Sequence, residues 1–317
     1  MRIGQNPAKY VKEVVKPARV TVAVLNYIPF MSGYYKDLLD VLKTCLNGIW
    51  ETAPAGEYDL LVFDNGSCEE ARQYLLDEHA EGRIQYLMFS QKNLGKGGAW
   101  NNILAGAPGE IIAYTDNDCQ FSKGWFEESL RLLETYPNVG MVTARPFRTN
   151  PEFYSGTVQW AQQTEGVVVE QGHFIPFDVF QAFDRSLGQS DEQIREHYDH
   201  SQDVRLTYQG VPAMVGASHW QFMAYKTVLQ QFLPFDMNRP MGQVKQLDQR
   251  MNEAGFLRLM PVEPLAMNLS NTLRAVAAPT VKQTTAGAKR IWADFPPVKK
   301  TLLAVYDKIF RLYYDRD

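Results

Sequence analysis

Two carboxylates, Asp116 and Asp118, stand one residue apart where a short apolar run ends. The run, Ile111 to Thr115, has the length and residue types of a buried strand. Ligands of open α/β sheets bind outside the carboxyl ends of the strands, so this position places both acids at the mouth of a site. Paired carboxylates there suit a hard divalent cation that also binds phosphate oxygens. An isolated D-x-D is more often a solvated acidic turn than a metal site, so the residues around it decide between the two.

Composition sets broad limits on the protein. The 317 residues are enough for one large α/β domain or two small ones. Hydrophobic residues make up 45% and charged residues 21%, and the net charge of −4 does not favour nucleic acid as a partner. Cys45, Cys68 and Cys119 form no CxxC pair, so we expect reduced thiols and a cytoplasmic location. No apolar run approaches the ~20 residues that cross a bilayer, and we see no signal peptide.

Strands and helices alternate regularly in the first half of the chain. The expected strands are rich in β-branched residues, and the expected helices carry apolar residues at helical spacing. Ser67 and Glu70 form a capping-box pattern at the start of one helix. This alternation predicts an α/β fold with a mostly parallel sheet and helices on both faces. The expected strands are 19–26, 58–63, 84–89, 110–115 and 139–144, and the expected helices are 34–50, 68–79, the segment after 98 through 107, and 123–135.

Regular patterning fades after Arg145. We expect Thr149 to Gln209 to be a long irregular insertion, functional or mobile. Strands return between Val211 and Tyr225, and a helix from Gln243 to Ala254 ends before Gly255. We therefore expect one domain over 1–275, with halves 19–146 and 147–275, and then a linker and helical tail over 276–317.

Four stretches in this order resemble the family-two glycosyltransferases of the GT-A fold: VTVAVLNY, VFDNGS, NLGKGGAWN and AYTDND. Their spacing matches that family over roughly residues 20 to 146, about two fifths of the chain. Each stretch alone carries little information, whereas the ordered set is fairly specific. The resemblance implies transfer of a sugar from a nucleotide-sugar donor, typically with inversion and with Mn²⁺ or Mg²⁺.

The resemblance implies donor-binding roles at two strand ends. Asp64 would accept hydrogen bonds from the base or ribose, and an Asx-turn is the alternative. Asn26 and Tyr27 end the first strand, where members of the family hold the nucleotide. Ile28 stands where an asparagine is common in the family, which is a departure from its pattern.

The glycine-rich loop and the acidic pair complete the implied donor site. Asn93, Gly95 and Lys96 precede a helix, so backbone amides and the lysine could approach phosphate or ribose, unless the loop is only a turn. Asp118 would bind the metal that bridges the two phosphates, while Asp116, with Asn117 beside it, would contact ribose or metal. No GxxxxGK[ST] P-loop occurs, and the glycine-rich first loop of sugar nucleotidyltransferases is also missing.

The second half fits the family less closely. Members usually carry an acidic pair at the start of a late helix, and one of the two acids takes the acceptor proton. Alignment of this helix places Gln243 and Val244 on that pair. The nearest acids, Asp248 and Asp236, are therefore the candidate catalytic bases.

Aromatic and histidine residues complete the set of candidates. A late histidine near the metal is common in the family, but Asn268 occupies that region here. His219 could serve as the ligand instead, with a packed structural role as the alternative. Trp160, His173 and Trp220 are candidates for the acceptor pocket because flat aromatic faces suit sugar rings, and ordinary core packing is equally open.

We therefore expect a GT-A-like, metal-dependent, inverting glycosyltransferase of the hexosyl type. Its partners would be a nucleotide-sugar donor and a glycan or lipid-linked acceptor. A catalytically impaired sugar-nucleotide-binding protein is the alternative, since the acidic pair is missing. From Val298 to Tyr314 the apolar residues fall on one stripe, which predicts an amphipathic helix. That helix would dock on its own domain, on a second subunit, or on the inner membrane face as a peripheral contact.

Overall fold

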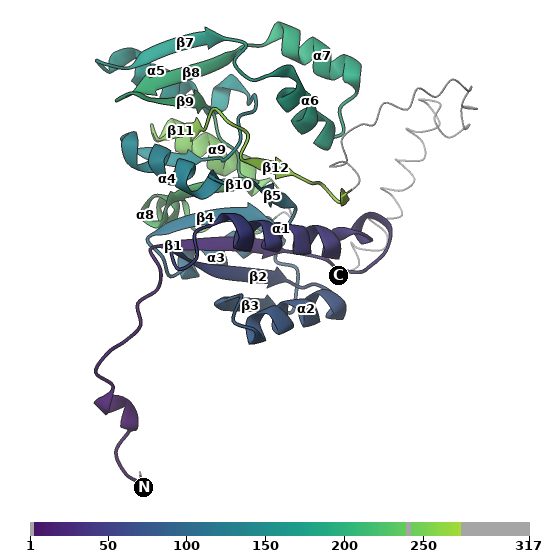
Figure 1. The fold of residues 1–317 in the computed structure, drawn as a ribbon, viewed down its shortest axis with the longest axis vertical. Helices are drawn as coiled ribbons and strands as arrows, with labels where there is room; N and C mark the ends of the chain where they lie inside the picture. Colours follow the sequence, from purple (N-terminus) through teal and green to yellow (C-terminus); the bar gives the residue numbers. More distant parts are fainter. Residues whose placement is uncertain (1–2, 239–241, 274–317) are drawn as a thin grey trace, which may run out of the picture. The chain divides into compact units, whose positions relative to one another are not determined.

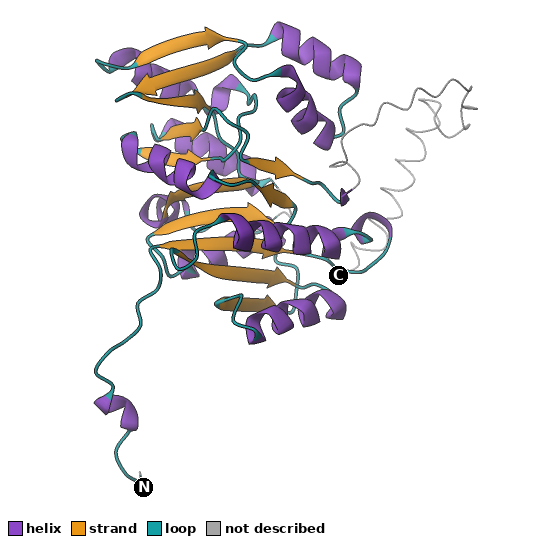
Figure 2. Ribbon diagram, in the orientation of Figure 1, coloured by secondary structure: helices purple, strands orange, loops and turns teal. Residues whose placement is uncertain are grey.

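A mixed ten-stranded sheet forms the centre of the computed structural model, which describes residues 3–238 and 242–273 (Figure 1). The strand order is β3-β2-β1-β4-β10-β6-β11-β9-β8-β7. Helices lie along both faces of this sheet (Figure 2). The predicted α/β class is therefore confirmed.

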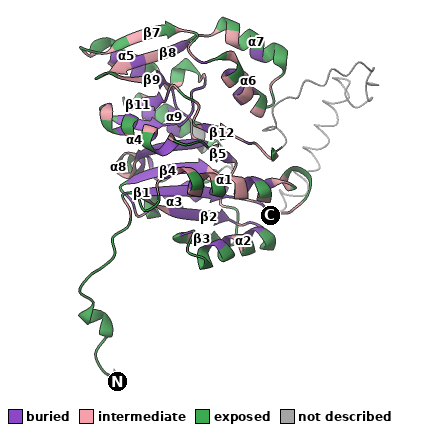
Figure 3. Ribbon diagram, in the orientation of Figure 1, coloured by how far each residue is buried: buried purple, intermediate pink, exposed green. Residues whose placement is uncertain are grey.

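The first half of the sheet is parallel, as its sequence pattern predicts. β1 (Val20–Asn26) pairs with β2 (Tyr58–Asn65) on one side and with β4 (Ile111–Asp116) on the other. β3 (Tyr86–Ser90) extends the sheet beyond β2. Every residue of β1 is buried, because the strand is covered on both faces and rich in β-branched side chains (Figure 3).

Alternate side chains of β1 enter two different cores. Val20, Val22 and Val24 belong to a core that includes residues of several helices, whereas Ala23 and Leu25 belong to a core on the other face. This follows from the two-residue period of a strand. The first core includes residues of α1 (Leu38–Thr52), α2 (Glu69–Ala80) and α4 (Trp125–Thr135), and the second includes residues of α3 (Gly95–Gly106), α8 (Lys226–Leu229) and α9 (Gln243–Glu253).

The second half adds antiparallel pairs to the sheet. β10 (Gln221–Tyr225) lies antiparallel between β4 and β6 (Val139–Val142), and β11 (Leu257–Met260) runs parallel to β6. Consequently β4, β6 and β11 all run in the same direction. The short strands β5 (Cys119–Phe121) and β12 (Ala266–Asn268) form a separate two-stranded sheet beside Asp118.

The prediction that 149–209 is a long irregular insertion is wrong. This segment forms short amphipathic helices and two strands of a meander, which the strand β9 (Val211–Val215) continues. The helices and strands are too short, and the strands too exposed, to give a clear period in the sequence. The elements of this segment are a 3₁₀ turn at Pro151–Phe153, α5 (Ser155–Gln163), β7 (Val168–Gly172), α6 (Phe177–Ser186), α7 (Asp191–His200) and β8 (Asp203–Tyr208). Elsewhere in the chain, short 3₁₀ turns occur at Pro7–Tyr10, Gly33–Tyr35 and Gln230–Phe232.

The predicted C-terminal helix and its linker lie outside the described residues. Within the described part, no helix is both long enough and apolar enough to cross a membrane.

Candidate active site

The carboxyl ends of β1, β2 and β4 bring the predicted donor-binding residues together. The parallel register sets Asn26 opposite Asp64, and Leu25 opposite Asp116. The first turn of α3 reaches the same place, because Lys96 contacts the end of β4. Residues far apart in the sequence therefore form one polar cluster at this edge of the sheet.

Asp64 and Asn26 form the buried part of the cluster, and neither is exposed. Asp64 Oδ1 accepts a hydrogen bond from Asn26 Nδ2 over 2.9 Å, and Asp64 Oδ2 accepts one from the Ser67 backbone N–H over 3.2 Å. The second bond spans three residues, one more than an Asx-turn, so it stabilises the turn after β2 without forming that motif. The role of Asp64 in donor binding stays a prediction.

The expected capping box at Ser67 is wrong. Cys68, not Ser67, is the N-cap of α2 and makes no side-chain capping bond. Ser67 Oγ instead accepts hydrogen bonds from Asn26 Nδ2 over 3.0 Å and from the Ile28 backbone N–H over 2.9 Å. The hydroxyl therefore ties β1 to the turn after β2, which a local sequence pattern cannot reveal.

Two asparagines connect the neighbouring loops to this cluster. Asn117 Nδ2 donates to Asn26 Oδ1 over 2.8 Å, so the D-x-D segment is joined to β1. Asn65, which the sequence pattern did not single out, accepts from the Leu94 backbone N–H over 2.9 Å and donates to Asn93 Oδ1 over 3.0 Å. Asn93 Oδ1 also accepts from the Gly95 backbone N–H over 2.8 Å. The loop before α3 is thus held by side-chain hydrogen bonds rather than being a free turn.

Lys96 and Tyr114 hold the two carboxylate oxygens of Asp116, and the charge of Lys96 compensates that of the carboxylate. Lys96 Nζ lies 2.6 Å from Asp116 Oδ2, and the Tyr114 hydroxyl donates to Asp116 Oδ1 over 2.5 Å. The lysine side chain is 13% exposed and that of Asp116 25%, so this ion pair is partly shielded from water. Burial, together with the charge of Asp116, raises the pKa of Tyr114 well above its ordinary value, so that hydroxyl remains a donor.

Asp118 is the least satisfied carboxylate of the cluster. Burial first, and the charge of Asp116 second, raise its pKa to about 7, while Lys96 and a hydrogen bond from Asn268 act in the opposite direction. Its Oδ1 atom is buried without a hydrogen-bond partner among the described residues. A buried carboxylate oxygen without a partner is costly unless another group binds it.

A divalent cation fits this arrangement. An oxygen ligand of Asp118, next to the carboxylate of Asp116, is the type that Mg²⁺ and Mn²⁺ prefer. The described residues contain no group of three or more His, Cys, Asp or Glu side chains that could hold a metal. A cation would therefore need phosphate oxygens and water to complete its coordination, as Mg²⁺ commonly does.

His219 and Asp248 form a separate pair with Arg258. His219 Nδ1 lies 2.8 Å from Asp248 Oδ2, and the Arg258 guanidinium donates to Asp248 Oδ1. Arg258 is completely buried, and this burial lowers its pKa against the opposing effect of Asp248. Both oxygens of Asp248 are therefore occupied, and Nδ1 of His219 is not free for a metal. Their predicted roles as base and metal ligand rest on the sequence alone.

Asp236, the second candidate base, lies on an exposed loop. Its Oδ1 atom accepts a hydrogen bond from the Asn238 backbone N–H over 2.6 Å. Its other carboxylate oxygen makes no hydrogen bond with any described residue. The proposed role of Asp236 as a base accordingly remains a prediction.

The remaining candidates are dispersed. The Tyr27 ring makes an edge contact with Tyr35 at 6.0 Å. Trp160 packs against Tyr136 and Tyr208, at 6.1 and 5.6 Å between ring centroids. The structure thus places Trp160 in an aromatic cluster on the β8 side of the sheet. The other two acceptor candidates lie elsewhere, with His173 5.0 Å from the Tyr198 ring and Trp220 5.9 Å from the Phe183 ring.

Comparisons with known proteins point to one family. Residues 28–209, more than half of the chain, match the family model described as Glycosyl transferase family 2. Glycosyltransferase AglE of Haloferax volcanii is 25% identical over 137 residues, which cover 39% of this chain and 45% of that protein. The uncharacterized glycosyltransferase alr2836 of Nostoc sp. is 28% identical over 88 residues, or 27% of each chain. The matched segments thus span less than half the length of these relatives.

Two solved structures are similar at lower identity. One is the mannosyltransferase PcManGT from Pyrobaculum calidifontis in complex with GDP-Man and Mn²⁺, with a TM-score of 0.48 at 15% identity. That match covers 83% of this chain and 62% of the other. The other structure is S. aureus TarS 1-349, with a TM-score of 0.47 at 11% identity, covering 79% and 60% of the two chains.

Proposed function

Because the chain belongs to glycosyl transferase family 2, we propose that it transfers a hexosyl group from a nucleotide-diphosphate-sugar donor to an acceptor hydroxyl. We further propose that the transfer depends on Mn²⁺ or Mg²⁺ and inverts the anomeric configuration. The observation that carries the proposal is the Oδ1 atom of Asp118, which has no hydrogen-bond partner in the described part of the chain and lies beside the Lys96–Asp116 pair at the carboxyl end of β4.

Each residue of the cluster has a distinct task in this proposal. Asp118 would hold the metal, which when bound supplies a Lewis acid for the charge of the departing diphosphate. Lys96 would add positive charge near the phosphates while it remains paired with Asp116. Asp64 and Asn26, which are already ordered by Ser67, would present fixed polar groups to the base or ribose. The fixed arrangement lowers the cost of ordering when the donor binds.

A screen of donors tests the proposal. Nucleoside diphosphates and nucleotide sugars would be added to the protein with and without Mn²⁺, and the melting temperature recorded. A ligand that binds only the folded state stabilises it by mass action, so a true donor should raise this temperature more with Mn²⁺ than without it. If no nucleotide produces a metal-dependent rise, the proposal is wrong.

The alternative is a sugar-nucleotide-binding protein without transferase activity. The observation that favours it is the occupation of both Asp248 oxygens, by His219 and Arg258. Turnover separates the two functions, since a binding protein would take up a donor with metal but neither transfer nor hydrolyse its sugar. Release of nucleoside diphosphate from the donor that gives the largest stabilisation provides the measurement.

Location and partners belong to the same proposal. The free cysteines Cys45, Cys68 and Cys119 accord with a cytoplasmic protein. We propose a glycan or a lipid-linked glycan as the acceptor. Contact with a membrane or a second subunit through the C-terminal segment also remains a proposal.

A further inference from the structure

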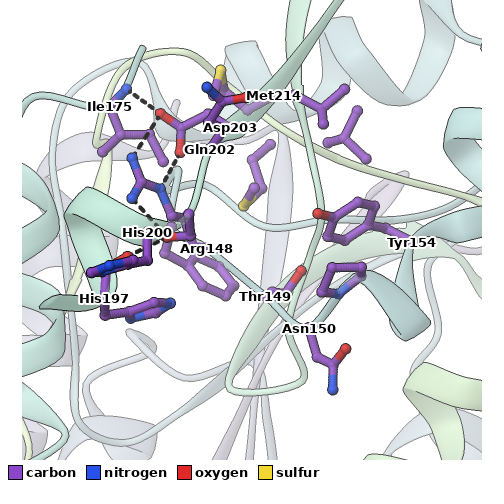
Figure 4. A pocket seen from close by; sticks show the side chains of 16 residues that line it. Arg148, Thr149, Asn150, Tyr154, Ile175, His197, His200, Gln202, Asp203 and Met214 are labelled. Atoms are coloured by element: carbon purple, nitrogen blue, oxygen red, sulfur yellow. Dashed lines mark hydrogen bonds and ion pairs between the residues drawn. The ribbon is translucent and has the colours of Figure 1, made fainter. Parts of the chain in front are cut away.

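A cavity of about 480 Å³ lies between the segment that follows β6 and the end of α7 (Figure 4). Its lining includes Met260, the last residue of β11, and Phe147 to Pro151 with Tyr154, which come shortly after β6. Since β4, β6 and β11 run in the same direction, the cavity lies at the edge of the sheet that also carries Asp116. Strands are spaced by about 4.8 Å, so β6 and β11 lie roughly 10–15 Å from β4 along this edge.

The charged side chains of the cavity wall compensate one another. Arg148 Nε donates to Asp203 Oδ1 over 2.6 Å, and the two side chains are 4% and 1% exposed. Asp203 Oδ2 also accepts two backbone N–H groups from the segment before α6. His197 lies 3.1 Å from a carboxylate oxygen of Asp184. The wall therefore presents compensated charges to a ligand, in contrast to the Asp118 cluster.

The rest of the lining combines apolar surface with hydroxyl and amide groups. Thr149 Oγ1 is buried and makes no hydrogen bond with any described residue. In Figure 4 the Tyr154 hydroxyl points toward the side of the cavity where Thr149 lies. Asn150 and Gln202 are exposed at the rim. The apolar residues are Phe147, Ile175, Val204, Met214, Val215 and Met260.

We propose that this cavity binds a neutral sugar unit of the acceptor. The apolar side chains suit the C–H faces of a sugar ring, and Thr149, Tyr154 and Gln202 suit its hydroxyls. An unpartnered buried hydroxyl favours a ligand that can pair with it. This proposal rests on the proposed function, because it assigns the cavity to the acceptor of that reaction. The lining runs from the residues after β6 to Asp203 and Val204 of β8, two to five strand spacings from β4. At roughly 10–25 Å from β4, the bound unit therefore lies further along the acceptor than the unit that receives the sugar.

Sugar binding can be measured without donor or turnover, so its outcome is separate from that of the proposed function. The full chain would be titrated, by saturation-transfer NMR, with the methyl glycosides of neutral disaccharides of glucose, galactose, mannose and N-acetylglucosamine. We expect at least one to bind at millimolar concentration, with or without Mn²⁺ and nucleoside diphosphate. Binding of none of them overturns the proposal, and so does stronger binding of decanol, which would indicate a pocket for an alkyl chain.

Two variants test whether the sugar binds in this cavity. Thr149→Val and Tyr154→Phe each remove one hydroxyl and should weaken sugar binding roughly threefold to tenfold. Thr149→Val should melt no lower than the wild type, because it removes an unpaired buried hydroxyl, so weaker binding there is not a result of unfolding. Tyr86→Phe, on the edge strand β3, removes an exposed hydroxyl and should bind as the wild type does. Unchanged binding in both cavity variants would contradict the assignment.

Discussion

Asp118 differs from the other acids of the cluster because one of its carboxylate oxygens has no hydrogen-bond partner among residues 3–238 and 242–273. Asp64 and Asp116 have their carboxylate oxygens held by side chains or backbone N–H groups. Removing the charge of Asp118 should therefore affect a bound cation much more than the fold. We predict that Asp118→Asn abolishes the metal-dependent part of donor binding. Calorimetry with and without Mn²⁺ measures this, and unchanged affinity in the variant would exclude Asp118 as the metal ligand.

The same carboxyl should make the stability of the metal-free protein depend on pH. Its pKa in the folded protein, about 7, lies above the ordinary value of 3.8. Between these values the folded protein holds a proton that the unfolded chain has lost, so stability falls as the pH rises through this window. We predict that the stability of the wild type relative to Asp118→Asn decreases from the acidic to the neutral side of the window. Urea unfolding in the presence of EDTA measures the difference, and a constant difference would contradict the raised pKa.

Asp248 is expected to be a structural residue as well as a candidate base. Arg258 is completely buried and depends on this carboxylate for charge compensation. Asp248→Ala would leave an unpaired buried cation, so we predict a loss of about 3–5 kcal/mol in the free energy of unfolding. Asp236→Ala, at the exposed candidate base, is the control and should change stability little. Similar stability in the two variants would show that the Asp248–Arg258 pair does not stabilise the fold.

At the scale of elements, the loop before α3 is placed by a close approach of two backbones. Gly66, in the turn after β2, has a φ of +88°, and a Cβ added there would lie 3.0 Å from backbone atoms of Lys92 and Asn93. Gly82 has a similar φ of +77° with open space around it. The two glycines therefore share the conformational requirement but differ in crowding.

We predict that Gly66→Ala destabilises the protein more than Gly82→Ala. Each variant forces an alanine into the left-handed region, which costs of order 1 kcal/mol. Only Gly66→Ala also pushes the Asn93–Lys96 loop away from β2, so it alone should weaken donor binding. Denaturant unfolding and donor titration of both variants measure the two effects. Equal losses of stability, with equal donor affinity, would mean that the close approach does not position the loop.

Regular elements were predictable where one physical pattern dominates. The parallel strands β1, β2 and β4 show continuous apolar runs because both of their faces are covered. The meander of β7 and β8 was missed because its strands are short and half exposed. The hydrogen bonds of Ser67 and Asn65 were also missed, since they join segments that meet only after the sheet has formed. Asp116 and Asp118 could be predicted, because strand-end acids leave a local signature.

At the scale of the whole molecule, the described residues form a self-contained domain. Its two hydrophobic cores, on opposite faces of the sheet, consist of residues between Val20 and Leu269. The described residues all belong to one compact unit, which ends at Ala277. A unit that contains its own cores on both faces of one sheet is expected to fold independently.

We therefore predict that a chain ending at Ala277 unfolds in one cooperative transition and binds the donor as the full chain does. The physical reason is that the donor cluster, the Asp248–Arg258 pair and both cores lie within Met1–Ala277. Calorimetric unfolding and donor titration of the two chains measure this. Sedimentation with liposomes of anionic lipid then tests the C-terminal segment, since loss of binding in the shorter chain alone would assign membrane contact to 278–317. A shorter chain that fails to fold would show instead that this segment completes the domain.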